Sequence, residues 1–361
     1  MPDMIPGKTL SRNFFHEIAK PILDRHFPGL SYTAGFLGYG SDVLGYDDET
    51  SRDHMWGPRF YLFLRPLDLV CEDEIRAVFS RELPYTYCGY SVNFSAPNPD
   101  DHGVQLARYI TEGPVNPLIW IQTVSEYLSE QLGRADIGNF TAADWLSISE
   151  HRLLSLASGE LYHDDLGMQA ILDRLAHYPD AVRRYLLASS WDAIACEEAF
   201  AKRTGTYGDE IGSRLICARI VERLMRLCFL YRNTYAPYSK WFGTAFDRLD
   251  VPEKLKTTLR DALRADDVLS RERLLTEAQA QVAALHNESG LTAPLPAEIV
   301  PYFRKEILVI WAERYAEALQ ETLRGTELEH TPLMGTLSQV ANLSTISDDP
   351  AHYRRIRKLY E

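Results

Sequence analysis

The pattern of apolar residues changes near residue 135, and this change constrains the fold of the 361-residue chain more than any other feature. Before this point, runs with helical spacing alternate with short runs rich in aromatic and β-branched residues. After it, almost every run has helical spacing. We therefore expect an α+β domain with a mixed β-sheet over residues 1–135, joined to an all-helical domain over residues 136–361.

The first part predicts helices and strands in alternation. Residues 59–64 (RFYLFL) form the densest aromatic and aliphatic run, which is typical of a central strand. The turn-rich sequence APNPDDHG separates the last two predicted strands. In chain order the prediction is a helix that begins near Leu10, strands at 31–37 and 59–64, a helix at 72–82, strands at 90–94 and 104–110, and a helix at 117–132.

The second part predicts a group of helices. Thr141 is a suitable N-cap for the run that contains Trp145, and Asp180 begins another run. The longest helix is predicted at 209–233, where a stripe from Ile211 and Leu215 to Leu227 should face a core. Further helices are predicted at about 252–264, 270–287, 301–323 and 350–360.

Composition narrows the classes of function. The formal net charge of −13 argues against broad nucleic-acid binding, because phosphate contacts require a basic surface. No stretch is long and apolar enough to predict a membrane span, and the start of the chain lacks the apolar core of a signal peptide. The five cysteines form no C-x-x-C pair, so we expect reduced thiols in a cytoplasmic protein and no zinc site.

Residues 38–66 (GYGSDVLGYDDETSRDHMWGPRFYLFLRP) contain the most informative motif. Gly40 and Ser41 predict a turn in which backbone N–H groups and a hydroxyl can approach a phosphate without a side-chain clash. Asp53 follows near the start of a strand, and carboxylates are ligands that Mg²⁺ prefers. A carboxylate two residues later would point to the same side of a strand. This chain has Met55 there, whose soft thioether does not suit Mg²⁺.

This arrangement resembles the nucleotidyltransferase superfamily, in which a Gly-Ser pair precedes Asp-x-Asp or Asp-x-Glu. The string GSDVLGYDDETSRDHMWGPR is similar to a motif of a bacterial family of unknown function, related to the aminoglycoside (kanamycin) and lincosamide nucleotidyltransferases. The segments WLSISEHRLLSLASGELYHDDLG and LMRLCFLYRNTYAPYSKWFGTAFDRL look like the helical second half of that family. The resemblance implies a nucleotidyltransferase-like first domain that transfers a nucleoside monophosphate from ATP or another nucleotide, with Mg²⁺, to a hydroxyl of a small molecule or protein.

The resemblance also assigns roles to particular residues. Asp53 would be the catalytic residue and metal ligand, and the nucleotide would contact Gly40, Ser41, Arg52 and, from the helical domain, Lys240. The family pattern expects carboxylates at Met55 and on a later strand, where Gln105 stands instead.

Two classes of function follow from these departures. One is an active nucleotidyltransferase. The alternative is a catalytically degenerate member that binds a nucleotide and acts as a regulatory or scaffolding protein. A third hypothesis is an adaptor whose helical domain binds another protein through exposed tyrosine and leucine side chains. The sequence leaves open whether the chain is an enzyme, and it does not indicate an oligomeric state.

Several charged groups allow both a structural and a functional interpretation. The acidic residues of the 42–49 loop either form a solvated surface loop, or one of them replaces the metal ligand that is missing at Met55. Arg52 forms an ion pair within that loop or contacts a phosphate. A basic stripe on the longest helix is paired with acidic neighbours or faces the triphosphate; its members are Arg219, Arg223 and Arg226. We interpret His163, Asp164 and Asp165 as a loop, and Glu197 and Glu198 as surface charges.

Overall fold

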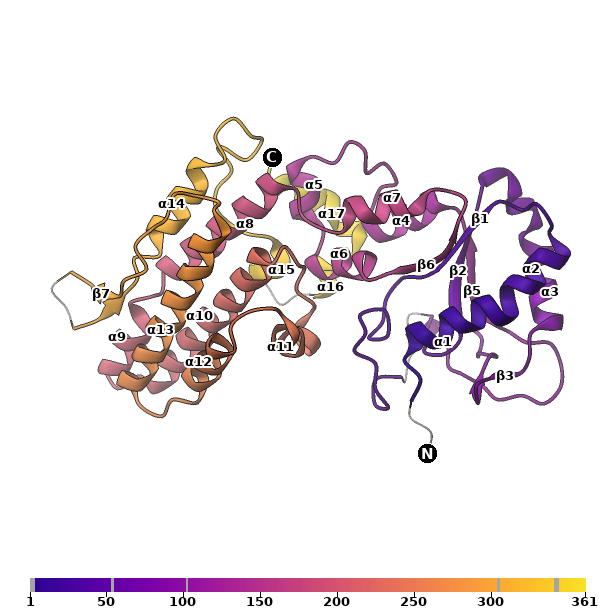
Figure 1. The fold of residues 1–361 in the computed structure, drawn as a ribbon, viewed down its shortest axis with the longest axis horizontal. Coiled ribbons are helices and arrows are strands. Elements are labelled where there is room, and N and C mark those ends of the chain that lie inside the picture. Colours follow the sequence, from indigo (N-terminus) through magenta and orange to yellow (C-terminus); the bar gives the residue numbers. More distant parts are fainter. Residues whose placement is uncertain (1–3, 53–54, 102, 304–305, 341–343) are drawn as a thin grey trace. The chain divides into compact units, whose positions relative to one another are not determined.

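The computed structural model describes residues 4–52, 55–101, 103–303, 306–340 and 344–361. About 53% of the chain is helical, and the predicted α+β class is confirmed. The chain forms two compact units, coloured in sequence order in Figure 1. The first comprises Met1–Asn139 and Arg152–Ala176, and the second comprises Phe140–His151 and His177–Glu361. The expected domain boundary at residue 135 stays a prediction.

A four-stranded mixed sheet forms the centre of the first unit, with strand order β5-β2-β1-β6. Its strands are β1 (Tyr32–Phe36), β2 (Arg59–Leu64), β5 (Leu118–Gln122) and β6 (Glu160–Asp164). β2 runs antiparallel to β1 and parallel to β5, and β6 runs antiparallel to β1. Phe36 pairs with Glu160, and Arg59 pairs with Leu118. The end of β1 and the starts of the other three strands therefore lie at one end of the sheet.

Helices cover both faces of this sheet. The chain opens with α1 (Gly7–Phe14), the π-helical turn η1 (Phe15–Ala19) and α2 (Lys20–His26), and these pack with α3 (Glu72–Glu82) against one face. On the other face, Tyr127 of α4 (Val124–Leu132) contacts the rings of Tyr61 and Phe63 at centroid distances of 5.1 and 5.3 Å. The remaining elements are η2 (Pro66–Cys71), β3 (Thr86–Tyr87), β4 (Tyr90–Ser91), η3 (Pro99–Asp101) and α7 (Met168–Leu175).

The prediction of one helix over 117–132 is wrong in its first half. Residues 118–122 form β5, because this β-branched and aromatic run pairs along its whole length with β2. Thr123 then begins α4 with a capping box: its side chain accepts from the Glu126 N–H, and Glu126 accepts from the Thr123 N–H. Gly133 ends the helix with a φ of 71°.

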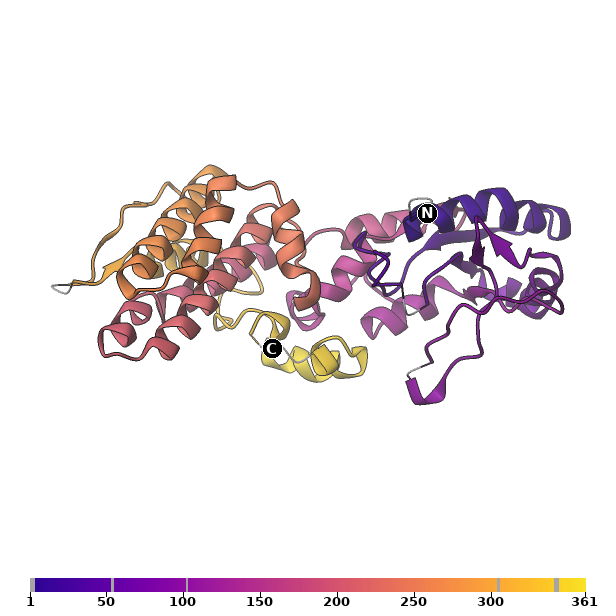
Figure 2. The same cartoon turned by 90° about the horizontal axis from the view of Figure 1, so that it is seen from below.

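The strand predicted at 104–110 is also not formed. Two isolated bridges, Asn98 with Val104 and Phe94 with Ala107, and single backbone hydrogen bonds such as that from the Arg108 N–H to the Asn93 carbonyl at 2.8 Å, tie this segment to the chain before it without forming a regular strand. Its apolar residues Leu106 and Tyr109 remain exposed, so no second layer supports a sheet there. Figure 2 shows the segment around η3 extending away from the sheet.

The second unit is helical apart from the small hairpin of β7 (Val300–Pro301) and β8 (Leu308–Val309), which replaces the start of the helix predicted at 301–323. Its longer helices are α8 (Asp180–Ala195), α10 (Glu210–Tyr231), α11 (Ser239–Arg248), α12 (Glu253–Arg264), α13 (Val268–Ser289) and α14 (Glu313–Glu321). Shorter helices complete it: α5 (Ala142–Ser147), α9 (Phe200–Thr206), α15 (Leu337–Val340), α16 (Ser344–Ser347), α17 (Pro350–Ile356) and η4 (Arg357–Leu359). Helix α6 (Glu150–Ala157) contains the boundary between the units.

The buried face of α10 differs from the predicted one in its first turns. Ile211 and Leu215 are 76% and 56% exposed. The side chains that face the neighbouring helices are instead Ser213, which donates a hydrogen bond to the Ala201 carbonyl of α9, and Cys217, which donates to the Ala262 carbonyl of α12. The predicted stripe is correct further along, where Ile220, Leu224 and Leu227 are buried.

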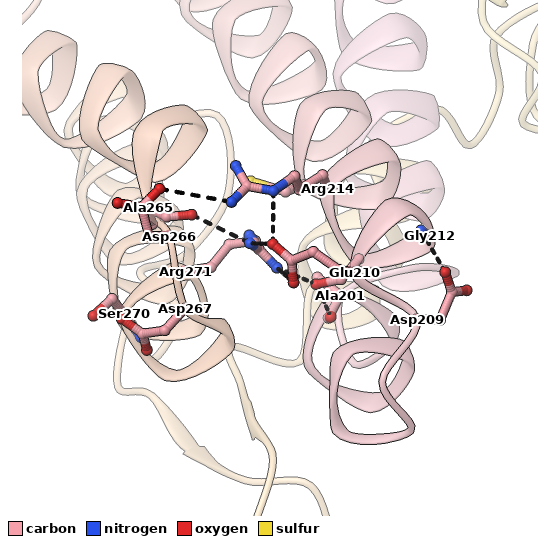
Figure 3. Close-up of polar contacts among 12 residues, drawn as sticks. Ala201, Asp209, Glu210, Gly212, Arg214, Ala265, Asp266, Asp267, Ser270 and Arg271 are labelled. Atoms are coloured by element: carbon pink, nitrogen blue, oxygen red, sulfur yellow. Dashed lines mark hydrogen bonds and ion pairs between the residues drawn. The ribbon is translucent and has the colours of Figure 1, made fainter.

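A buried arginine joins the N-terminal ends of α10 and α13 (Figure 3). Arg271 donates to the Glu210 carboxylate, to Ser213 Oγ at 2.6 Å and to the Ala265 carbonyl at 3.2 Å. Arg214 also donates to Glu210, at 2.6 Å. Each helix has its own N-cap, because Asp209 accepts from the Gly212 N–H and Asp267 from the Ser270 N–H.

Candidate functional site

The candidate site lies at the end of the sheet where β1 ends and β2 begins. The intervening loop turns at Gly40 and Ser41, as predicted from the sequence. The Tyr46 N–H donates to the Ser41 carbonyl at 2.8 Å, and the Gly45 N–H donates to the Asp42 carbonyl at 3.1 Å. Gly40 has a φ of +147°, and a Cβ there would lie 2.3 Å from Asp42 Oδ1. A side chain here would displace the Asp42 carboxylate from Arg59, and the positive φ also favours glycine at position 40.

Asp42 and Arg59 form a buried ion pair directly beneath the turn. Asp42 is 4% exposed and Arg59 is 2% exposed. Arg59 Nη2 donates to the two carboxylate oxygens at 2.9 and 3.0 Å, and its guanidinium lies over the Phe36 ring at 4.4 Å from the centroid. Burial raises the pKa of Asp42, while Arg59 acts in the opposite direction. The expectation that Asp42 belongs to a solvated loop is wrong.

Asp47 fastens the same loop to the start of α1. Its Oδ2 accepts from the Gly7 N–H at 2.7 Å and from Trp56 Nε1 at 2.9 Å. A carboxylate is stabilised there because the first N–H groups of a helix carry partial positive charge. A Cβ at Gly7 would meet Asp42 Cβ at 2.8 Å and Trp56 Nε1 at 3.0 Å. The start of α1, the loop and Trp56 therefore form one closely packed body.

Three charged residues at this end of the sheet did not follow from the motif. Lys8 Nζ donates to the Ser158 carbonyl at 2.7 Å, and Arg12 pairs with Glu160 at 2.9 Å. Burial lowers the pKa of Lys8, and Glu160 is the strongest of the carboxylates that oppose this effect. No sequence pattern indicates this cluster, because Glu160 reaches it only through the pairing of β6 with β1.

The positions of the expected carboxylates can be followed only in part. Asp53 lies outside the described residues. Met55 and Gln105, which occupy the other two positions, are neighbours: the Met55 N–H donates to the Gln105 carbonyl at 3.2 Å. Gln105 is not on a strand of the sheet. The strand that pairs with β2 on that side is β5, and its sequence LIWIQ contains no acidic residue.

Arg52 and Lys240 each lie over an indole ring. The Cζ atom of Arg52, an exposed residue of the first unit, is 5.7 Å from the Trp56 ring centroid. Lys240 belongs to the second unit, near the start of α11, and its Nζ lies 4.9 Å from the Trp241 ring centroid. Their predicted contacts with a nucleotide stay predictions.

Three carboxylates of the 42–49 loop are already bonded within the protein. Asp42 is paired with Arg59, and Asp47 is bonded to two N–H donors. Asp48 accepts from the N–H groups of Thr50 and Ser51 at 2.9 and 2.7 Å. Across the described part of the chain, no three His, Cys, Asp or Glu side chains gather in a metal-binding arrangement. The hypothesis that a residue of this loop replaces the missing ligand is therefore not supported by the contacts of these three carboxylates.

The basic stripe on α10 is paired with carboxylates, as its structural interpretation predicted. Arg219 and Arg223 both pair with Glu197, at 2.6 and 2.8 Å, so Glu197 is not a free surface charge. Arg226 pairs with Glu222 at 3.0 Å and with the buried Glu150 at 3.3 Å. Glu150 and Arg226 line a pocket of about 100 Å³ with residues 236–239, and burial raises the pKa of Glu150 against the effect of Arg226.

Two other expectations for acidic residues need correction. His163 and Asp164 belong to β6 rather than to a loop, and Asp164 caps α7 by accepting from the Met168 and Gln169 N–H groups, both at 2.9 Å. Glu198 accepts from the N–H groups of Ile310 and Ala312 at 3.1 and 3.2 Å. Burial raises its pKa to about 7, so Glu198 is a partly buried anchor and not a surface charge.

Comparison with known proteins identifies one region. Residues 145–242 match a family model described as a domain of unknown function, DUF4037. The match includes Glu150, Arg226 and Lys240 but not the Gly40–Ser41 turn. No curated protein matches the chain. Among the helices of the described residues, none has the length and apolar character needed to cross a membrane.

Proposed function

We propose that the first unit is a nucleotidyltransferase-like module that binds a nucleotide by its phosphates at the Gly40–Ser41 turn. We further propose that the chain acts as a nucleotide-binding regulatory or scaffolding protein. We prefer a binding protein to an active transferase because the loop carboxylates are already engaged. Asp42, Asp47 and Asp48 accept hydrogen bonds from groups of the protein itself. They stabilise the turn and are not placed as a set of metal ligands.

The charge distribution around the turn supports phosphate binding. The Asp42 charge is balanced by Arg59, and the Asp47 charge lies at the positive end of α1. The exposed Arg52 adds a cation at the edge of the loop. A phosphate near the Ser41 hydroxyl would therefore meet less repulsion than the acidic sequence of the loop suggests.

The alternative is transfer of a nucleoside monophosphate to a hydroxyl of a small molecule or protein. It keeps Asp53 as metal ligand and catalytic residue, and Mg²⁺ would hold the triphosphate and balance its charge. This alternative requires a second carboxylate at the site, and Met55 and Gln105 supply none.

Calorimetric titration with ATP tests the proposal. We expect ATP to bind with and without Mg²⁺, and Asp53→Ala to leave the affinity nearly unchanged. Ser41→Asp should weaken binding by about tenfold or more because it places a negative charge beside the phosphates. Ser51→Asp, in the same loop, is the matched control and should have little effect. Lys240→Ala tests whether the second unit contributes.

Each other outcome has a defined meaning. Absence of ATP binding under both conditions would contradict nucleotide binding. Binding that requires both Mg²⁺ and Asp53 would favour the transferase alternative instead. Release of pyrophosphate by the wild-type protein with a hydroxyl acceptor would establish that alternative, and its appearance only in Met55→Asp would show that a single lost carboxylate separates the two functions.

A further inference from the structure

A pocket of about 240 Å³ lies beside Arg52, Trp56 and Gly57 of the first unit. Its large side chains are three aromatic rings and one cation, from Trp56, Tyr90, Tyr109 and Arg52. The remaining lining residues are small: Gly57, Gly89, Ser91 and Ala107. Trp56 and Tyr90 meet edge to face, with ring centroids 4.9 Å apart. Among the described residues that line the pocket, Arg52 is the only charged one. The pocket therefore presents ring faces and one positive charge.

The polar ends of these aromatic side chains are bonded within the protein. Trp56 Nε1 donates to Asp47, Tyr90 Oη accepts from the Ile5 N–H at 3.4 Å, and Tyr109 Oη donates to the Gly89 carbonyl at 3.0 Å. The rings are held in place before any ligand arrives, so stacking on them costs little conformational entropy. Tyr109 is nevertheless 66% exposed, which leaves most of its ring surface open to a ligand.

The pocket is joined to the Gly40–Ser41 turn by direct packing. Trp56 Nε1 and the Gly7 N–H share one oxygen of Asp47. Gly7 in turn packs against Asp42, and Asp42 packs against Gly40. The turn and the aromatic pocket are thus parts of one closely packed region of the first unit.

We infer that this pocket binds the base of the nucleotide, by stacking on its rings and by the cation of Arg52. The inference rests on the proposed function, which places the phosphates at Gly40 and Ser41. Base stacking on aromatic side chains contributes about 1–3 kcal/mol per base. Because the Trp56 indole N–H and the Tyr109 hydroxyl already donate hydrogen bonds within the protein, we expect ring area to select the base more than its hydrogen-bonding edge does. Adenine and guanine nucleotides should bind within about threefold of one another, and pyrimidine nucleotides more weakly.

Two probes separate the base from the phosphates. Adenosine tests the pocket alone, and inorganic tripolyphosphate tests the turn alone. In calorimetric titrations, Tyr109→Ala should weaken adenosine binding by about tenfold and leave tripolyphosphate binding unchanged. Ser41→Asp should do the reverse. Tyr207→Ala is the matched control, because Tyr207 is an exposed tyrosine of the second unit and should affect neither probe.

The two proposals fail in different ways. Adenosine binding that is absent, or unchanged in both Tyr109→Ala and Arg52→Ala, would overturn the pocket even if tripolyphosphate binds. If tripolyphosphate does not bind but adenosine binds in a Tyr109-dependent manner, the phosphate site is overturned and the base pocket is supported. A clear preference for adenosine over guanosine would overturn the claim that ring area selects the base.

Discussion

Two arginines of this chain are equally inaccessible to water but are held in different ways. Arg59 in the first unit is 2% exposed and Arg271 in the second is 1% exposed. The carboxylate partner of Arg59 is Asp42, whose side chain is only 4% exposed. The partner of Arg271 is Glu210, whose side chain is 46% exposed.

The difference shows how burial of the partner decides what a charged pair does. Where both charges are buried, each one depends on the other, because neither can recover its hydration without unfolding. Where the carboxylate stays at the surface, water can replace the arginine. The Asp42–Arg59 pair should therefore hold the candidate loop in one conformation. The Arg271 network in Figure 3 also joins two helix ends, but its loss should lower the free energy of unfolding by less.

The largest expected effect is that of Arg59→Met. It leaves Asp42 buried without a cation and should lower the free energy of unfolding of the first unit by about 3–5 kcal/mol. Hydrogen exchange of peptides from β1 and β2 measures this loss. The double variant Asp42→Leu with Arg59→Met should recover much of it, since no charge is then buried alone. A loss below about 1 kcal/mol for the single variant would contradict the comparison.

Arg271→Met should cost less. Ser213 Oγ and the Ala265 carbonyl lose a buried donor, for which we expect about 1–3 kcal/mol. Glu210 becomes hydrated. The readout is hydrogen exchange of peptides from the first turns of α10 and α13. An effect as large as that of Arg59→Met would show that exposure of the carboxylate makes no difference.

A third test uses a buried polar network of the second unit that carries no charge. Trp191 Nε1 donates to Tyr231 Oη at 2.7 Å, and the His286 ring lies between Tyr231 Oη and Thr292 Oγ1 at 3.0 and 2.8 Å. Burial lowers the pKa of His286 to about 4. Because the unfolded chain binds this proton near pH 6.5 and the folded chain does not, stability from His286 is complete above pH 6.5 and is lost as the pH falls towards 4.

The measurement compares wild type with His286→Gln. Between pH 7 and pH 5 the wild type should lose about 1–2 kcal/mol relative to the variant. The free energy of unfolding of the wild type must be compared with that of the variant at each pH, because Glu198 in the same unit contributes in the opposite sense. Its pKa is raised to about 7, so its contribution to stability grows as the pH falls. His330→Gln, which removes an exposed histidine of the second unit, should behave as the wild type. If the free energies of unfolding of wild type and His286→Gln differed by the same amount from pH 7 to pH 5, a neutral His286 in this network would be excluded.

The smallest expected effect is that of Arg214→Ala. Arg214 is 42% exposed and lies at the edge of the Arg271 network. Its removal should change the free energy of unfolding by less than about 0.5 kcal/mol, because exposed ion pairs are screened by water. Thermal melting in low and high salt checks this. A larger loss would mean that the whole network in Figure 3, and not Arg271 alone, stabilises the helix ends.

Much of the fold could be predicted where a local pattern was strong. The run RFYLFL gave β2, and the helical spacing beyond residue 135 gave the helices α8, α10 and α13. The run at 118–122 was misread, since a short apolar segment is compatible with a helix until its pairing partner is known. The exposure of Ile211 and Leu215 could not be predicted, because periodicity alone does not say which neighbours cover a helix face.

The same division holds at the candidate site. The sequence by itself determined the Gly40–Ser41 turn, the acidic loop and the absence of a carboxylate at Met55, since these depend on residues close together in the chain. Only the tertiary structure decided that Asp42 is paired with Arg59, that Asp47 binds the start of α1, and that Trp56, Tyr90 and Tyr109 line one pocket. The physical reason is that the charge state and hydration of a side chain depend on neighbours from distant segments of the chain. The spacing of residues in the sequence does not show which segments become neighbours.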